Sequence, residues 1–390
     1  MGLQCSDVDL EVYEEHIAGT LRGYDRISQL VGPSLPVKYP RTPGYRPSPD
    51  ENTLNGWYWK CDIKGDDNGK LSGKTIGIKD NVAVAGVPMM NGSKLLEGYV
   101  PEFDATVVTR ILDAGGRILG KTNCEDLCMC GSSFTNVTGP TVNPHDKSRS
   151  SGGSSSGSAV LVAAGEIDMA IGGDQGGSIR IPASWCGIVG LKPTFGLVPY
   201  TGACPIEITI DHLGPMARNV HDCALLLEVI SGPDGNNDPR QSNNFHVPEY
   251  TKQLHTEITG KKIALITEGF ACCEQNVQDV VKETALKLSS KGALVEEVSI
   301  PLHKDGLAVW SAIALEGAYN CLYKGNERLK ADSGMDVNCM PFNCTGHPAI
   351  SINAGKSLHG LPVGMMIVGR HFDEVSVLQI AYAYEQLQKI

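Results

Sequence analysis

Short apolar and polar blocks succeed one another regularly from about Lys74 to the C-terminus. Brief apolar runs typical of buried strands occur at 75–78, 117–120, 167–171, 262–266, 294–300, 349–352 and 363–368. Apolar residues at helical spacing occur at 105–113, 158–165, 220–231, 277–290 and 376–387. This alternation predicts an α/β fold whose sheet is covered by helices on both faces.

The N-terminal part has a different pattern. One helix is predicted at about 10–30, and six prolines follow between residues 33 and 49. We therefore expect an N-terminal helical extension with a Pro-rich tether over residues 1–62, and one larger domain over residues 63–390. Within that domain, Asp104 is expected to cap the helix at 105–113, and Asn219 or Asp222 the helix at 220–231.

Composition narrows the class of protein. The net charge of -11 is spread along the chain without a Lys/Arg cluster, which argues against nucleic acid as a partner. The sequence has no apolar run long enough for a transmembrane span, and its first residues predict no secretory signal. Thirteen cysteines in such a chain are typical of reduced thiols, so a cytoplasmic location is expected.

The first residues also match the M-G-x-x-x-[ST] pattern for N-myristoylation at Gly2. Asp7, Asp9 and Glu11 follow at once and would be repelled by an anionic membrane, which counts against lipidation.

Cys124, Cys128 and Cys130 form the one tight cysteine cluster in the sequence. Their C-x3-C-x-C spacing is not a usual zinc pattern and no histidine pair lies nearby. Buried small apolar residues on a helix are the favoured interpretation, and no metal is predicted.

Two glycine-rich blocks carry the candidate chemistry. Residues 148–158 read SRSSGGSSSGS and residues 172–180 read GGDQGGSIR, which places Ser154 and Ser178 each directly after a Gly-Gly pair. Glycine lets backbone N–H groups approach a reacting oxygen closely, so each serine is a candidate nucleophile with nearby amide donors. For the first block, a flexible Gly/Ser linker is an equally good interpretation.

Three other patterns have structural alternatives. Residues 115–122 (GGRILGKT) match a phosphate-binding loop, but a helix precedes them and the supposed loop is itself predicted as a strand. Residues 153–157 match G-x-S-x-G around Ser155, with Asp211 and His212 downstream, but the preceding segment is too polar for a nucleophile elbow. Lys79, beside Asp80 at a strand end, is either an ion-paired lysine or a general base.

The blocks GIKDN, GGSSSGSAVLVAAG and DQGGSIRIPASWCGIVGLKPT occur in this order, and together they resemble the amidase signature family of serine amidohydrolases. The resemblance extends from about Lys74 to the C-terminus. It implies a mixed β-sheet core, amide hydrolysis through an acyl-enzyme, a small-molecule amide substrate and no cofactor. The resemblance is also compatible with a homodimer.

The resemblance also implies a role for each site residue. Ser178 would be the nucleophile, Ser154 the bridging serine on a cis peptide bond after Gly153, and Lys79 the base. Backbone amides of Gln175, Gly176, Gly177 and Ser178 would bind the oxyanion. Asp174 and Arg180 would fix the loop, and Cys128 would line the substrate cleft.

One departure from the family concerns its acyl pocket. Relatives carry a long insertion before the block at 342–348 (FNCTGHP), whereas residues 325–340 bridge this gap in a few positions. The main hypothesis is an active amidase, and Gln175 is more typical of general amidases, including those that act downstream of nitrile hydration. The alternatives are a catalytically impaired homologue or an amidotransferase-type subunit with an incomplete pocket.

Overall fold

The computed structural model describes residues 6–30, 35–242, 245–322 and 337–389, and it divides the chain into two units, 1–36 and 37–390. The first unit contains helix α1 (Asp7–Gln29), close to the predicted bounds. Ser6 and Asp9 form a capping box, because the Ser6 hydroxyl accepts the Asp9 N–H and the Asp9 carboxylate accepts the Ser6 N–H. The predicted myristoylation site at Gly2 lies outside the described residues.

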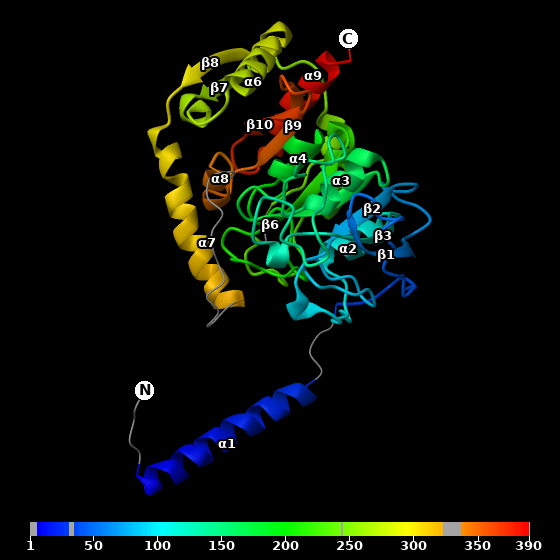
Figure 1. Ribbon diagram of the computed structural model, residues 1–390, viewed down its shortest axis with the longest axis vertical. Coiled ribbons are helices and arrows are strands. Elements are labelled where there is room, and N and C mark those ends of the chain that lie inside the picture. The colour runs from blue at the N-terminus through cyan, green and yellow to red at the C-terminus, as the bar shows by residue number, and fades with distance from the viewer. Residues whose placement is uncertain (1–5, 31–34, 243–244, 323–336, 390) are drawn as a thin grey trace. The chain divides into compact units, whose positions relative to one another are not determined.

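The second unit is built on an eight-stranded sheet (Figure 1). Its strand order is β1-β3-β2-β4-β6-β5-β9-β10, and β2 runs parallel to β3 and β4 while the other pairs are antiparallel. The strands are β1 (Trp57–Lys64), β2 (Thr75–Lys79), β3 (Arg117–Thr122), β4 (Met169–Asp174), β5 (Val189–Lys192), β6 (His212–Ala217), β9 (Ala349–Lys356) and β10 (Pro362–Val368). The predicted mixed sheet is therefore confirmed.

Helices cover both faces of this sheet. Side chains alternate between the faces along a strand: Met169 and Ile171 of β4 pack in one apolar cluster, and Ala170 between them packs in another. The first cluster includes residues of α2 (Thr106–Asp113), α5 (Val220–Ile230), α6 (Gln275–Lys287) and α9 (Glu374–Leu387). The second includes residues of α3 (Ser156–Ala164) and α4 (Arg180–Cys186). This confirms the predicted α/β class.

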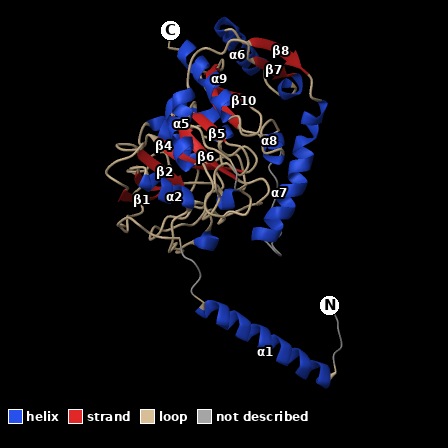
Figure 2. Ribbon diagram, turned by 180° about the vertical axis from the view of Figure 1, so that it is seen from behind, coloured by secondary structure: helices blue, strands red, loops and turns tan. Residues whose placement is uncertain are grey.

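A smaller element group follows α5 in the chain (Figure 2). Strands β7 (Lys262–Ile266) and β8 (Leu294–Val298) form a parallel pair connected through α6. Helix α7 (Gly306–Leu322) follows, and α8 (Met340–Cys344) precedes β9. None of the described helices is long and apolar enough to cross a membrane.

Two local features differ from the sequence-based expectations. The structure divides the chain after Pro36 instead of at residue 62, because β1 pairs with β3 and so joins residues 57–62 to the main sheet. Asp104 does not cap α2. Its buried carboxylate accepts the Ala85 N–H over 2.9 Å and pairs with Arg41, so both of its oxygens are engaged away from the helix end. Asn219, not Asp222, caps α5.

Candidate active site

Lys79 ends strand β2 and is fully buried. Its Nζ donates hydrogen bonds to Ser154 Oγ over 2.8 Å and to the Gly173 carbonyl over 3.0 Å. The adjacent Asp80 does not bind Lys79. It pairs instead with Lys121 of β3 over 2.9 Å and accepts the N–H groups of Met90 and Asn91. Of the two interpretations of Lys79, the ion pair with Asp80 is thus excluded, and the amine points at a serine.

Ser154 lies in the loop before α3, and the Gly153–Ser154 peptide bond is cis. Its side chain is completely buried, and its carbonyl accepts the Glu125 N–H over 3.3 Å. The glycine that follows in α3 is required by close packing: a Cβ at Gly157 would lie 2.3 Å from the Gly56 carbonyl oxygen. The block is therefore a packed turn, and the flexible-linker interpretation is wrong.

Ser178 lies between β4 and α4, and 7% of it is exposed. Ser155 connects the two serine loops. Its N–H donates to the Ser178 carbonyl over 3.2 Å, and its hydroxyl donates to the Gly173 carbonyl over 3.1 Å. The backbone that carries Ser178 is thus bonded directly to the residue after Ser154.

Asp174 and Arg180 form a buried bidentate ion pair across the Ser178 loop, at 3.0 and 2.9 Å. Burial raises the pKa of Asp174, but the Arg180 guanidinium outweighs it and holds this pKa well below its usual range. Asn343 of α8 donates to Asp174 Oδ1 and accepts from Arg180, at 2.9 and 2.6 Å. Two sets of contacts therefore fix the loop. One is the ion pair between Asp174 and Arg180, and the other is the hydrogen bonds of Asn343 in α8, which is distant in sequence.

The predicted oxyanion amides are only partly free. The Gly177 N–H donates to Asp174 Oδ1 over 2.9 Å, so this predicted donor is already engaged by the carboxylate that holds the loop. The N–H groups of Gly176 and Ser178 donate to no acceptor within the described part of the chain. Gly177 itself has φ +142°, and a Cβ there would lie 2.7 Å from Ile181, so a side chain is excluded.

Cys128 is buried near Lys79 and Ser154: burial raises the pKa of its thiol, and Cys124, Lys79 and Ser154 lower it to about 7. Cys124 and Cys128 are buried as predicted, whereas Cys130 is half-buried. The prediction that the cluster lies on a helix is wrong, because only a 3-10 turn, Asp126–Cys128, occurs there. Among the described residues, no three His, Cys, Asp or Glu side chains are arranged to hold a metal ion.

The structure does not support the two rival sites. Lys121 of the phosphate-loop match lies within β3 and pairs with Asp80, so the match is a strand, as predicted. His212 makes no hydrogen bond to Ser155 among the described residues. Its ring bonds to the Ile210 carbonyl and to Lys192 instead, and burial, assisted by the charge of Lys192, lowers its pKa well below the ordinary value.

Sequence reasoning missed Trp310 of α7 and Tyr200. Trp310 Nε1 donates to the Gln175 carbonyl over 2.6 Å, and a Cβ at Gly176 would lie 2.9 Å from the indole. The Tyr200 hydroxyl accepts a hydrogen bond from Gln175 Nε2 over 2.9 Å. Neither residue belongs to a motif, so only the three-dimensional structure reveals them.

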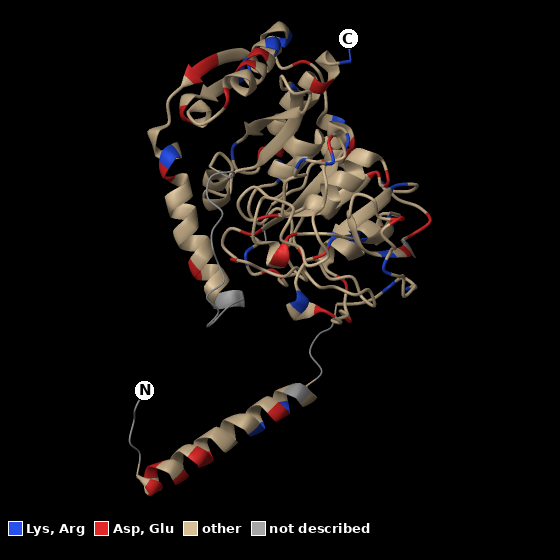
Figure 3. Cartoon of the chain, viewed as in Figure 1, with Lys and Arg blue, Asp and Glu red and all other residues tan. Residues whose placement is uncertain are grey.

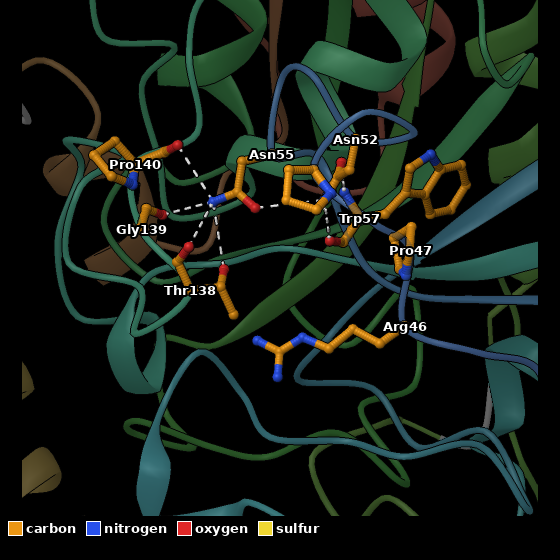
Figure 4. A pocket seen from close by; sticks show the side chains of 9 residues that line it. Arg46, Pro47, Asn52, Asn55, Trp57, Thr138, Gly139 and Pro140 are labelled. Atoms are coloured by element: carbon orange, nitrogen blue, oxygen red, sulfur yellow. Dashed lines mark hydrogen bonds between the residues drawn. The ribbon is translucent and has the colours of Figure 1, made fainter.

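A surface pocket of about 390 Å³ lies apart from these side chains (Figure 4). Asn55 directs its amide nitrogen to the carbonyl groups of Thr138, Gly139 and Pro140, so its donors are engaged within the protein. None of Lys79, Ser154 and Ser178 lines this pocket. The Asn55 amide therefore stabilises the loop at 138–140.

Comparison with known proteins places the chain in a family. The sequence model described as Amidase matches residues 57–338 and 327–378, which is most of the chain. The chain belongs to the amidase signature family. This amidase shares 39% identity with the enantioselective amidase of Rhodococcus rhodochrous over 459 aligned positions, which cover 92% of this chain and 87% of that protein.

Solved structures support the same assignment. A glutamyl-tRNA(Gln) amidotransferase subunit from Thermotoga maritima superposes with a TM-score of 0.76 at 31% identity, over 82% of this amidase and 84% of that chain. The native peptide amidase of Stenotrophomonas maltophilia gives a TM-score of 0.74 at 28% identity, with the same coverage of 82% and 84%. The predicted family and its fold are thereby confirmed.

Proposed function

We propose that the protein hydrolyses carboxylic acid amides to a carboxylate and ammonia or an amine, with Ser178 as nucleophile, Ser154 as proton relay and Lys79 as base. The observation that carries this proposal is the buried Lys79–Ser154 hydrogen bond of 2.8 Å, with Ser178 held next to it through Ser155. A buried amine bonded to a serine can act as a base where no histidine is available.

In the proposed first step, Ser178 Oγ attacks the carbonyl carbon of the amide. The Ser178 proton passes to Ser154 Oγ, and the Ser154 proton passes to a neutral Lys79 amine. The N–H groups of Gly176 and Ser178 are the free donors that would stabilise the oxyanion. Asp174 and Arg180 act indirectly, because they hold the loop that carries these N–H groups in position.

Collapse of the tetrahedral intermediate breaks the C–N bond, and the leaving nitrogen takes its proton from Lys79 through Ser154. The product of this step is an ester on Ser178. Water then attacks the ester carbonyl, with the same relay accepting its proton, and releases the carboxylate. The relay thus serves as base and acid in both halves of the cycle.

Two unpartnered acceptors support a substrate with amide N–H groups. Asn81 Oδ1 and Gln175 Oε1 are buried and have no hydrogen-bond partner among the described residues. Both side chains and Lys79 surround Gly173, where a Cβ would lie 3.3, 3.6 and 3.5 Å from their nitrogens. Buried acceptors without a partner are costly, so we propose that a primary carboxamide satisfies them on binding.

We further propose that the chain lacks part of the segment that relatives carry between α7 and α8. The predicted shortening at 325–340 lies mostly outside the described residues, so other observations support it. The alignment with the Rhodococcus amidase has 69 more positions than the chain has residues, and the family model matches in two pieces that overlap at 327–338. A shorter segment would leave Trp310 as a wall of the acyl pocket.

Amidotransferase subunits are also among the relatives, so the experiment must separate the two activities. Along the described ribbon after residue 36, Lys and Arg alternate with Asp and Glu (Figure 3), and the net charge of -11 does not favour tRNA as a partner. We expect the purified chain alone to hydrolyse simple aliphatic and aromatic primary amides, and Ser178→Ala to abolish turnover. Absence of turnover across a broad amide panel would favour the impaired homologue or the amidotransferase-type protein.

A further inference from the structure

Two cysteine thiols meet on one amide oxygen beside the candidate triad. Cys128 Sγ donates to Asn91 Oδ1 over 3.2 Å, and Cys124 Sγ donates to the same oxygen over 3.5 Å. The two side chains also lie close enough for each to shift the pKa of the other. Because both sulfurs contact a single atom, the two thiols are neighbours, as a disulfide requires.

The surroundings of the two thiols make them chemically different. Burial raises the pKa of Cys128, but the neighbouring Cys124, Lys79 and Ser154 outweigh it and lower this pKa to about 7. Burial raises the pKa of Cys124 well above its usual value. Cys128 is therefore partly a thiolate near neutral pH, the form that reacts with oxidants, while Cys124 stays a thiol.

The loop that carries both cysteines is bonded to the catalytic backbone. The Cys128 N–H donates to the Glu125 carbonyl over 2.9 Å, and the Glu125 N–H donates to the Ser154 carbonyl over 3.3 Å. Leu127 and Cys128 have φ angles of +49° and +61°, a left-handed conformation that side-chain-bearing residues seldom adopt. Two backbone hydrogen bonds through Glu125 therefore connect the turn at Cys128 with the Ser154 carbonyl.

We propose that Cys128 is an oxidation site through which a hydroperoxide, such as hydrogen peroxide, reversibly switches the enzyme off, with Cys124 as the resolving thiol. In the first step the Cys128 thiolate attacks one peroxide oxygen. An S–O bond forms, the O–O bond breaks and hydroxide leaves, so the sulfur is oxidised to a sulfenic acid while the peroxide is reduced.

In the second step Cys124 Sγ attacks the sulfenic sulfur. The S–S bond forms, the S–O bond breaks, and the thiol proton leaves with the hydroxyl group as water. The disulfide withdraws Cys128 Sγ from Ser154 and Lys79 and pulls on the turn bonded to Ser154. A dithiol reductant reverses it by thiol–disulfide exchange. The loss of activity rests on the proposed function, whereas the sulfur chemistry does not.

The test treats the full chain with hydrogen peroxide, removes the oxidant with catalase, and follows amide hydrolysis and peptide mass in the same samples. We expect a peptide linking Cys124 to Cys128 to appear as activity falls, and dithiothreitol to restore both. With peroxide present, Cys128→Ser should be inactivated about tenfold more slowly than wild type, with the activity of each protein measured relative to its own untreated value. Cys272→Ser, which removes an exposed thiol elsewhere, should behave as wild type.

Cys124→Ser tests the resolving step. In this variant we expect a sulfenic acid at Cys128 that dimedone traps, and activity that dithiothreitol fails to restore after long exposure, because sulfinic acid has formed. Equal inactivation of wild type and Cys128→Ser would overturn the proposal, as would full activity of the disulfide form. A reduced protein that hydrolyses no amide would refute only the proposed function. Peptide mass spectrometry would still detect the disulfide and so would still test the sulfur chemistry.

Discussion

Lys79 Nζ lies 2.8 Å from Ser154 Oγ, although the two residues are 75 positions apart and the nearest carboxylate in sequence, Asp80, is bonded to a different lysine. The pairing of Asp80 with Lys121 is what leaves the Lys79 amine directed at a hydroxyl group. Two buried lysines from neighbouring strands thus have opposite surroundings. One is part of an ion pair, and the other is placed to exchange a proton.

These two lysines provide a matched pair of variants. Lys79→Met should lower kcat for a primary amide by about 10²–10⁴-fold, since it removes a general base, and should leave folding largely intact. Lys121→Met should instead lower the free energy of unfolding by roughly 3–5 kcal/mol, because it leaves the Asp80 carboxylate buried and unpaired. Steady-state kinetics and thermal unfolding of both variants check this. Wild-type turnover in Lys79→Met would disprove the assignment of the base.

Asn343 should support activity from a distance. Asn343→Leu removes the hydrogen bonds to Asp174 and Arg180, so we expect a loss of about 1–3 kcal/mol in stability together with a clear fall in kcat. Asn338→Leu is the control, because Asn338 also makes two hydrogen bonds, to Gly269 and His303, but none to the Ser178 loop. An equal effect of the two variants on kcat would argue against a positioning role for Asn343.

Trp310 should limit the size of the acyl group. Trp310→Phe keeps an aromatic ring but loses the hydrogen bond to the Gln175 carbonyl, and we expect a moderate fall in kcat. Trp310→Ala opens the space next to Gly176 and should shift the ratio of kcat/KM toward bulkier amides by about tenfold. A panel of amides of increasing acyl size measures this ratio. An unchanged order of preference in Trp310→Ala would place the acyl pocket elsewhere.

Asp211 should make stability depend on pH. Burial raises its pKa to about 7, from a usual value near 4, despite hydrogen bonds from the Ile206 and Glu207 N–H groups. A raised pKa favours the protonated form in the fold, so this contribution to stability is present below about pH 4 and is lost as the pH rises to about 7. Asp211→Asn cannot ionise, and its melting temperature relative to wild type should therefore rise across this range. A constant difference would contradict the shift.

Sequence patterns located β2, β3, β4, β9 and β10 of the main sheet, because short apolar runs mark buried strands. They did not predict β5 and β6, which lie among glycines and prolines. Strand β1 was missed because its residues follow directly on a Pro-rich stretch and their pairing with β3 is not visible locally. Asp104 looked like a helix cap, but Arg41 and the Ala85 N–H compete for its carboxylate in the folded protein. In both cases, contacts between residues far apart in sequence determined the local structure.

The candidate site shows the same limit. Glycine-rich blocks marked Ser154 and Ser178 as candidates, and the strand-end position left Lys79 open between an ion pair and a base. The resemblance to the amidase signature family then favoured the base. The commitment of the Gly177 N–H to Asp174 could not be predicted, because it depends on the exact turn of the loop. Asn343 and Trp310 approach the loop from 169 and 135 positions away, and no short pattern marks them.

The central claim is that Ser178 is the nucleophile and that Lys79 activates it through Ser154. The most direct measurement is peptide mass spectrometry after treatment of the full chain with a fluorophosphonate, which forms a stable adduct with an activated serine. The account predicts labelling of Ser178 in the wild type and strongly reduced labelling in Lys79→Met. Labelling at Ser154 or Ser155, or equal labelling of Ser178 in both proteins, would contradict it.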